Sequence, residues 1–347
     1  MPILNKEDKK EVLRYEEFLK KNKASAMQDI KWSKVKNNWI NEIIYLEKNG
    51  EIVASMSILL NKVTKLNTYM MYASRGPVCD FYNIDLVNKL VKEVDLLRKK
   101  YPAFILKMDP EVLRNEELVK LYKSNGYKVI ENKNKVIQPK HNMVLNIQNK
   151  TEEELLKGFA EKTRYNIRVA TKKGIKIKYS RSKEDLKIFY NIYKITTIRD
   201  KIGCRPYEYF ERMLDAFDEN ELRVYIAYHE ETPLAAAIAL NYGSKMFYIY
   251  GASSNEKRNL MPTYLLQFEM IKWGIEEKCR TYDFGGVFEF TNSNGLYKFK
   301  SGFCKQEGVT EYIGEIDKVY NPFISFIYND IFPIIKNIKK KIRKMKR

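Results

Sequence analysis

Apolar and polar positions along the chain follow one plan twice. Each copy predicts a β-hairpin, an amphipathic helix and a further strand, over 51–78, 85–100 and 103–110 in the first copy and over 231–254, 262–278 and 280–286 in the second. The hairpin segments alternate with a period of two residues, whereas the helical segments repeat about every 3.6 residues. Two copies of the same order of elements predict an internal duplication.

The last strand of each copy ends in an aspartate, Asp109 in the first and Asp283 in the second. A hairpin that leads into a strand–loop–helix–strand unit is the central pattern of the acyltransferase fold known as GNAT. The chain is therefore predicted to be an α/β (α+β) protein with two GNAT-like domains.

The loop between strand and helix bears on the cofactor. In an acetyl-CoA enzyme of this fold the loop is rich in glycine, so that its backbone N–H groups can hold the pyrophosphate. The corresponding loops here, SRGPVCDFYNI and SNEKRNLM, contain one glycine and none. We therefore expect a GNAT-like scaffold that uses neither coenzyme A nor another cofactor.

The composition narrows the chemistry further. The 347 residues suffice for two domains with separate cores. The four cysteines are scattered, and the two histidines, His141 and His229, lack suitably spaced partners. A metal site, a disulfide framework and a histidine-dependent triad are therefore not expected, which leaves Lys, Arg, Asp, Glu, Tyr or backbone groups for catalysis.

The net charge of +19 predicts an anionic partner. Residues 336–347 include eight basic residues and no acidic one, and they follow the aromatic and aliphatic stretch 320–335. This order suits the surface of an anionic membrane, and it equally fits a terminal helix docked on the core with a solvated end. The sequence shows neither a signal peptide nor a membrane-spanning stretch, so we expect a cytoplasmic protein.

A second concentration of charge lies in KTRYNIRVATKKGIKIK, residues 162–178. The acidic start at Thr151–Leu156 and a glycine stop signal predict a helix that carries this charge. On that helix Arg164, Arg168 and Lys172 would form one basic stripe at spacing i, i+4, i+8. Such a stripe either follows a phosphate backbone, as in tRNA, or is an ordinary solvated face.

Eight further stretches carry a resemblance that covers nearly the whole chain in order. They are WSKVKNNW (32–39), YASRGPVCD (72–80), LKMDPEV (106–112), KTRYNIRVATKKGIKI (162–177), YIYGASSNEKRNLMPTYLLQFEMIKW (248–273), YDFGGV (282–287), GLYKFKSGFC (295–304) and EYIGEIDKVYNP (311–322). Together they resemble the FemABX family of peptidoglycan-bridge aminoacyltransferases. Several family members carry a long charged helical arm, for which the stretch 188–225 leaves no room here, so the chain resembles the armless, FemX-like branch.

The resemblance implies a domain over 1–147, completed by 314–347, and a second domain over 148–313. It implies transfer of an amino acid from aminoacyl-tRNA, the co-substrate, to the side-chain amine of the peptidoglycan stem peptide. The acceptor would be lipid II or UDP-MurNAc-pentapeptide, bound by the first domain, while the second would take the tRNA. We expect a monomer whose basic tail makes peripheral contact with the inner face of the membrane.

The resemblance also assigns catalytic and tRNA-binding residues. Lys300 matches the reactive-centre lysine, whose ammonium could stabilise developing negative charge, and Phe299 matches an aromatic that stacks on the terminal adenine. The alternation of YKFKSGF leaves open a strand in which Lys298 and Lys300 face solvent and Phe299 faces the core. Asp109 would accept a proton from the acceptor amine or hold that amine, or it would only form a turn or a helix N-cap.

Five residues match substrate-binding positions or lie near them. Lys36 and Arg205 match residues that hold the acceptor's phosphates, and Tyr209 follows Arg205 at a spacing that predicts one helical face. Tyr248 matches another substrate contact, although Tyr250 has the same strand parity and is an alternative. Trp39, one helical turn beyond Lys36, would line the same site or pack in the core with Trp32.

Two rival functions remain open from the sequence. One is an acyl-CoA-dependent N-acyltransferase of the GNAT fold, against which the glycine-poor loops argue. The other is a non-catalytic RNA- or membrane-binding protein that uses the same basic surface. The amino acid transferred and the choice of acceptor cannot be predicted from the residues.

Overall fold

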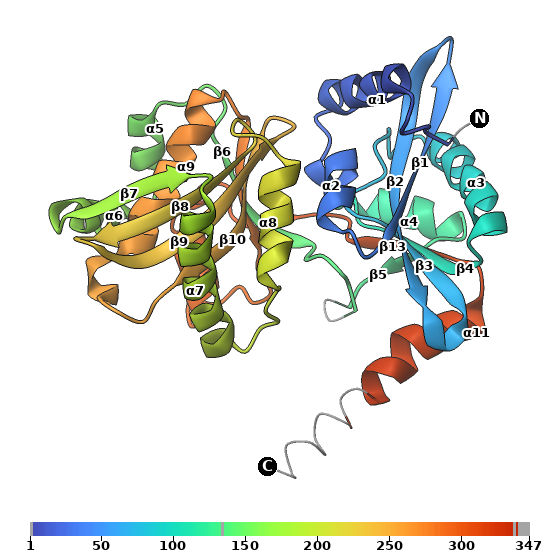
Figure 1. The fold of residues 1–347 in the computed structure, drawn as a ribbon. Coiled ribbons are helices and arrows are strands. Elements are labelled where there is room, and N and C mark those ends of the chain that lie inside the picture. The colour runs from blue at the N-terminus through green and yellow to red at the C-terminus, as the bar shows by residue number, and fades with distance from the viewer. Residues whose placement is uncertain (1–2, 133–134, 336–337, 339–347) are drawn as a thin grey trace. The chain divides into compact units, whose positions relative to one another are not determined.

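The computed structural model describes residues 3–132, 135–335 and 338. These residues form two compact units (Figure 1). The first unit takes Met1–Ser33, Asn37–Lys140 and Tyr312–Arg347, and the second takes Lys34–Lys36 and His141–Glu311. Apart from Ile338, the predicted basic tail at 336–347 lies outside the described residues.

The first unit is built on a six-stranded sheet in the order β1-β2-β3-β4-β13-β5. Its strands are β1 (Ile40–Lys48), β2 (Glu51–Val63), β3 (Thr68–Ala73), β4 (Ala103–Met108), β5 (Lys128–Ile130) and β13 (Glu315–Val319). Only the β3–β4 pair among these neighbours is parallel. The helices of this unit are α1 (Lys9–Lys21), α2 (Ile30–Val35), α3 (Ile84–Lys100), α4 (Glu116–Ser124) and α11 (Pro322–Phe326).

Helix α3 shows why these residues form a helix packed on the sheet. The side chain of Asn83 caps its first turn by accepting from the backbone N–H of Leu86. Val87, Leu90 and Val94, spaced i, i+3 and i+7, are fully buried in one cluster with residues of β2 and β4. The apolar stripe predicted from the sequence therefore forms the main core of the first unit.

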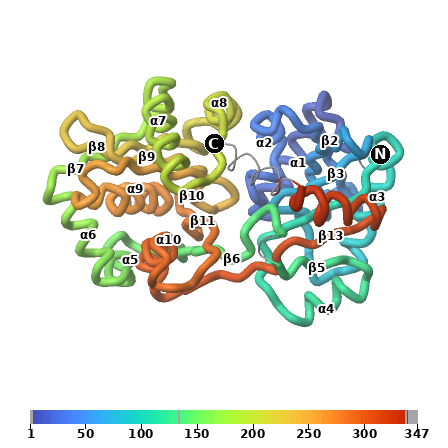
Figure 2. Tube along the Cα trace, turned by 90° about the horizontal axis from the view of Figure 1, so that it is seen from below, coloured from blue at the N-terminus to red at the C-terminus, as the bar shows by residue number. Residues whose placement is uncertain are grey.

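The C-terminal segment returns to the first unit. Strand β13 lies between β4 and β5 and pairs antiparallel with both, as the orange-red trace beside β5 shows in Figure 2. The unit thus regains the chain at Tyr312, two residues before the predicted 314.

The second unit is built on a seven-stranded sheet in the order β12-β6-β11-β10-β9-β8-β7. Its strands are β6 (His141–Asn146), β7 (Ile175–Ser180), β8 (Leu222–His229), β9 (Thr232–Tyr242), β10 (Lys245–Ser253), β11 (Thr281–Gly286) and β12 (Thr310–Glu311). Its helices are α5 (Glu152–Gly158), α6 (Glu161–Lys172), α7 (Lys183–Asp200), α8 (Tyr207–Ala216), α9 (Pro262–Glu276) and α10 (Gly295–Ser301).

The boundary between the units lies earlier than the predicted 147/148. Residues of β6, assigned to the first domain from the sequence, pair antiparallel with β11 in the second sheet. Lys34–Lys36, which includes the last two residues of α2, also belongs to the second unit, in which the Nε of Arg212 in α8 donates to the carbonyl oxygen of Val35 at 3.2 Å. Neither assignment was made from the sequence.

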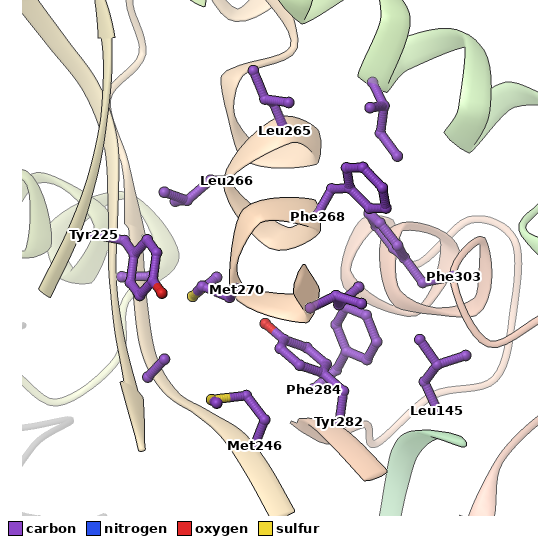
Figure 3. Packing of buried hydrophobic residues seen from close by; sticks show 14 of the residues in the cluster. Leu145, Tyr225, Met246, Leu265, Leu266, Phe268, Met270, Tyr282, Phe284 and Phe303 are labelled. Carbon is purple, nitrogen blue, oxygen red and sulfur yellow. The ribbon is translucent and has the colours of Figure 1, made fainter. Parts of the chain in front are cut away.

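Helix α9 is enclosed by apolar side chains on several sides (Figure 3). Leu266 and Met270 pack toward Tyr225 and the strands, whereas Phe268 points toward Phe303 on the opposite side. Such an all-round apolar helix is typical of the centre of a core. Phe303 follows α10 and lies in the same core, so this packing connects α9 to the helix that carries the predicted catalytic lysine.

The duplication predicted from the sequence is confirmed. The order β2-β3-α3-β4 recurs as β9-β10-α9-β11, and in both copies the hairpin is antiparallel and the last strand pairs parallel with the hairpin's second strand. Residues 188–225 form the rest of α7, then α8 and the start of β8, so this described stretch contains no coiled-coil arm. Within the described ranges, no helix is both long and apolar enough to cross a membrane.

Candidate active site

Asp109 is buried at the end of β4, with 2% of its surface exposed. Its Oδ2 accepts a hydrogen bond from the Tyr72 hydroxyl at 2.6 Å, and its Oδ1 accepts one from the backbone N–H of Arg75 at 2.6 Å. The N-cap alternative is wrong, because Asn115 caps the following helix α4. Asp109 is instead a carboxyl group held against β3 and the turn that follows it.

The surroundings of Asp109 favour its neutral form. Burial raises the pKa of this carboxyl group to about 7, although the positive charge of Arg75 and the two hydrogen bonds act in the opposite direction. The Glu315 carboxylate adds to the increase, and it is itself paired with the buried Lys107 at 2.8 Å. A carboxyl group that titrates near neutral pH is a more effective base than an ordinary aspartate.

Three of the predicted substrate-binding residues meet in the second unit. The Nζ of Lys36 lies 5.2 Å from the centre of the Tyr209 ring, and the Cζ of Arg205 lies 5.3 Å from the same point. Burial, together with the charge of Arg205, lowers the pKa of Lys36 to about 8. An anion bound beside two neighbouring cations would relieve their repulsion, so this group suits phosphate.

Arg205 and Tyr209 were predicted to lie close together on one face of a helix, but the structure brings them together in another way. Helix α8 begins at Tyr207, after Pro206, so Arg205 precedes the helix and does not share a helical face with Tyr209. The two side chains nevertheless face each other, because Tyr209 lies in the first turn of α8.

A β-bulge in β10 separates the two tyrosines that the sequence placed at equal parity. Tyr248 pairs with Ala239, and the register then shifts so that Tyr250 pairs with Ile238. Tyr248 packs with the core that includes Ala239 and α9. Tyr250 instead donates to the Tyr209 hydroxyl at 3.2 Å. The structure therefore places Tyr250, not Tyr248, with Tyr209.

Lys300 lies in helix α10, so the strand alternative for YKFKSGF is wrong. Its ammonium group is buried, with 5% of the residue exposed, and it donates to the carbonyl oxygen of Gly286 at 2.9 Å. Burial lowers the pKa of Lys300 to about 8, while the negative charge of Asp283 acts to raise it. A buried ammonium close to neutrality can stabilise an oxyanion and can also exchange a proton near physiological pH.

Asp283 organises the turn that faces Lys300, a role that the sequence did not indicate. Its Oδ1 accepts from the backbone N–H of Gly285 at 2.7 Å, and its carboxylate also accepts from the side-chain amide of Asn142. Gly285 has a φ of +75°, which favours glycine. The sequence signal was YDFGG (282–286), in which two glycines follow Asp283 after one residue; the predicted strand end at Asp283 was wrong, because β11 continues to Gly286.

Phe299 is half-buried beside Lys300. Its ring meets Tyr264 edge-to-face with centroids 4.9 Å apart and Phe303 with centroids 5.5 Å apart. The residue is only partly buried, and it packs against the core of the second unit.

A family model for the FemAB family matches residues 10–230 and 224–330. The chain belongs to the FemAB family. The resemblance predicted from the sequence motifs is thereby confirmed.

Curated relatives match this FemAB-family chain along almost its whole length. It is 38% identical over 336 residues to a UDP-N-acetylmuramoylpentapeptide-lysine N(6)-alanyltransferase of Weissella viridescens, covering 93% of this chain and 97% of the relative. It is 29% identical over 399 residues to a lipid II:glycine glycyltransferase of Staphylococcus epidermidis, covering 93% and 95%.

Solved structures agree with the fold. A crystal structure of FemX matches with a TM-score of 0.82 and 26% identity, covering 91% of this chain and 98% of that one. A tandem GNAT protein from the clavulanic acid biosynthesis pathway matches with a TM-score of 0.55 at 9% identity, covering 91% and 96%, which shows the fold alone. The predicted pair of GNAT-like domains is confirmed.

Trp39 of the FemAB-family chain does not lie one helical turn beyond Lys36, because α2 ends at Val35. Its side chain packs against a cluster of the first unit that includes Val63 and Phe104, whereas Trp32 is not part of that cluster. Trp39 is therefore a packing residue, although its partners differ from the one predicted.

The predicted tRNA-binding stripe is divided. The predicted single helix is interrupted at Phe159 and Ala160, so α5 and α6 are two separate helices. The guanidinium of Arg164 donates to the carbonyl oxygens of Lys157 and Phe159, at 3.3 and 2.5 Å, and so caps the end of α5. Arg168 and Lys172 are exposed. Of the two predicted tRNA-binding arginines, Arg164 therefore has a structural role at the end of α5, and Arg168 is exposed to solvent.

Proposed function

We propose that this protein transfers an aminoacyl group from aminoacyl-tRNA to the side-chain amine of the stem peptide in UDP-MurNAc-pentapeptide or lipid II. The observation that carries the proposal is the end-to-end similarity to the alanyltransferase, at 38% identity. The buried Lys300 and Asp109, whose pKa values of about 8 and about 7 lie near neutrality, support it chemically.

In the proposed step the neutral amine attacks the ester carbonyl that joins the amino acid to the terminal ribose. An amide bond forms, the ester C–O bond breaks, and the ribose hydroxyl leaves with a proton. The Lys300 ammonium would stabilise the oxyanion or the leaving ribose oxygen, since it is desolvated and fixed on the Gly286 carbonyl. Asp109 would hold the acceptor amine and take its proton.

The acceptor's phosphates would bind Lys36 and Arg205. Lys36 supplies a point charge and Arg205 a planar fork, and Tyr209 lies within reach of both. The hydroxyl of Tyr250, which donates to Tyr209, would complete the polar side of this site. Tyr248 packs against the core, so it would not contact the substrate and would affect binding only by helping to position β10.

On the tRNA side, Phe299 would stack on the terminal adenine and Arg168 would contact the backbone. Base stacking on an aromatic ring contributes about 1–3 kcal/mol per base. We propose that the reaction needs no coenzyme A. In support, the Arg75 N–H in the first strand-to-helix loop already donates to Asp109, and the second loop presents long side chains where glycines would be needed. We also propose that the protein acts in the cytoplasm as a monomer.

The test is to incubate the protein with alanyl-, glycyl- or seryl-tRNA and UDP-MurNAc-pentapeptide, and in parallel with lipid II. The expected product is an acceptor heavier by one amino-acid residue, measured by mass spectrometry. Lys300→Met should abolish its formation, whereas the matched variant Lys298→Met, which changes an exposed lysine of the same helix, should retain it. Absence of product with all three tRNAs, or product formation from acetyl-CoA alone, would contradict the proposal.

A further inference from the structure

The segment Pro322–Ile335 has one apolar face on the first unit and another toward solvent. Helix α11 continues through a π-turn at Ile327–Ile331 and a further helical stretch at 332–335. On its inner face, the Tyr328 ring lies 5.2 Å from the Phe104 ring and 6.2 Å from the Phe332 ring. This face holds the segment against the sheet of the first unit (Figure 1).

The outer face is unusually apolar for an exposed helix. The exposed apolar side chains of this segment, together with the nearby Ile338, are called the outer apolar residues: Phe323, Phe326, Ile334, Ile335 and Ile338. Phe323 alone leaves 73% of its surface open to solvent. Scattered exposed apolar residues are common, but five within one short segment mark a surface that binds a partner.

The sequence that contains and follows these residues has a positive net charge. Asp330 is the one acidic residue in this segment, and its Oδ1 is paired with the Nζ of Lys135 at 2.6 Å. The sequence then adds eight basic residues over 336–347 without an acidic one. An apolar face next to a basic run combines the two attractions that hold a peripheral protein on an anionic bilayer.

We propose that the C-terminal segment docks on an anionic lipid surface, with the outer apolar residues entering the interface and the basic residues of the sequence that follows adding electrostatic attraction to the headgroups. A second copy of the chain is disfavoured as the occupant, because pairing two such segments would bring two basic runs together. RNA would use the basic run but would leave the outer apolar residues in water.

The inference concerns a surface apart from Lys300, Asp109 and Lys36, and so extends beyond the proposed function. If the proposed function is also correct, docking would bring the enzyme to an acceptor that is carried on lipid. Vesicle binding can be measured without tRNA or acceptor, so failure of one proposal is distinguishable from failure of the other.

The experiment measures partitioning of the full-length protein onto vesicles of phosphatidylcholine with and without phosphatidylglycerol, by flotation. We expect binding only to the anionic vesicles, weakened by salt. Phe323→Ser combined with Phe326→Ser should weaken it about tenfold, and deletion of 339–347 should weaken it more than about tenfold. Ile198→Ser, which changes a 79% exposed residue of α7, is the matched control and should bind as wild type does.

Three results would overturn the inference. The first is no binding to anionic vesicles at low salt. The second is equal binding by the paired serine variant and the Ile198→Ser control, which would leave only an electrostatic contact. The third is a wild-type dimer in sedimentation that the paired serine variant loses, which would assign the face to a second copy. Turnover of the soluble nucleotide acceptor by the paired serine variant should equal wild type and reports that the variant folds.

Discussion

The ammonium group of Lys300 donates to the carbonyl oxygen of Gly286, 2.9 Å away, at the end of β11. Among the residues that the structure describes, this is the one hydrogen bond of the ammonium group, so its other two N–H groups can donate to a substrate oxygen. Because the residue is buried, this arrangement costs folding free energy whenever the lysine is charged.

Lys300→Met should lose activity and gain stability at neutral pH. The folded-state pKa is lowered from 10.5 to about 8, so the unfolded chain binds more protons between these values and stability rises with pH across that window. The penalty is fully present below pH 8 and amounts to at most roughly 3 kcal/mol. Urea unfolding should give a larger free energy of unfolding for the variant than for wild type at pH 7, and a smaller difference between the two at pH 10.

Lys298→Met provides the reference for this measurement, because it removes a charge from the exposed side of the same helix. An equal change in unfolding free energy for both variants would mean that burial of Lys300 carries no penalty.

Asp283→Asn should shift the pH profile of turnover without unfolding the protein. The amide can still accept from the Gly285 N–H, but the negative charge that raises the pKa of Lys300 is lost. The limb of the kcat profile that reports Lys300 should therefore move to lower pH. A uniform loss of kcat at every pH, with the limb unmoved, would assign Asp283 to the shape of the turn alone.

The repeated order of elements could be predicted, because hydrophobic periodicity can be followed along the chain. The strand end at Asp109 was predicted to within one residue, but the one at Asp283 was wrong, since β11 continues to Gly286. Helix α10 was left open because alternation in a seven-residue segment fits either state, although Asn294, whose side chain caps its first turn, was an available signal. The opposite packing of Tyr248 and Tyr250 depends on a bulge in the pairing of β10 with β9, which parity along one strand does not reveal.

Side-chain partners across the fold were the least predictable part of the site. The sequence predicted one helix where the structure has two, α5 and α6. Arg164 in α6 can cap α5 only because of this interruption. Lys36 meets Arg205 although they are far apart in the sequence, and their roles came from the resemblance rather than from spacing. Tertiary contacts of this kind are set by packing and leave no periodic trace.

Tyr250→Phe should weaken acceptor binding more than Tyr248→Phe. The first variant removes the hydroxyl that donates to Tyr209, at a cost of about 0.5–1.5 kcal/mol, or a few-fold in KM for the nucleotide acceptor. The second removes a hydroxyl in the core beside α9 and should mainly lower the unfolding temperature. Steady-state kinetics together with thermal unfolding separate the two effects, and the reverse order of KM values would restore Tyr248 as the substrate contact.

Arg164→Ala and Arg168→Ala should fail in different assays. The first leaves the carbonyl oxygens of Lys157 and Phe159 without their guanidinium donor and should destabilise the fold by about 1–3 kcal/mol. The second removes an exposed cation and should leave stability unchanged while reducing the salt dependence of tRNA binding. Filter binding over a range of salt concentrations tests this, and an unchanged slope for Arg168→Ala would exclude a phosphate contact.

Asp109→Asn tests whether the carboxylate is needed in its charged form. Its pKa is raised from 3.8 to about 7, so wild-type kcat should rise with pH through about 7 if the ionised group takes the amine's proton. The asparagine variant should lose this limb and about a hundredfold or more of kcat. Tyr72→Phe, which removes one donor to the same carboxyl group, should keep the limb but move it to higher pH, because that hydrogen bond favours the ionised form. If wild-type kcat does not change between pH 5 and 8, Asp109 does not take the proton. Its role would then be limited to positioning the amine and accepting the hydrogen bond from the Arg75 N–H.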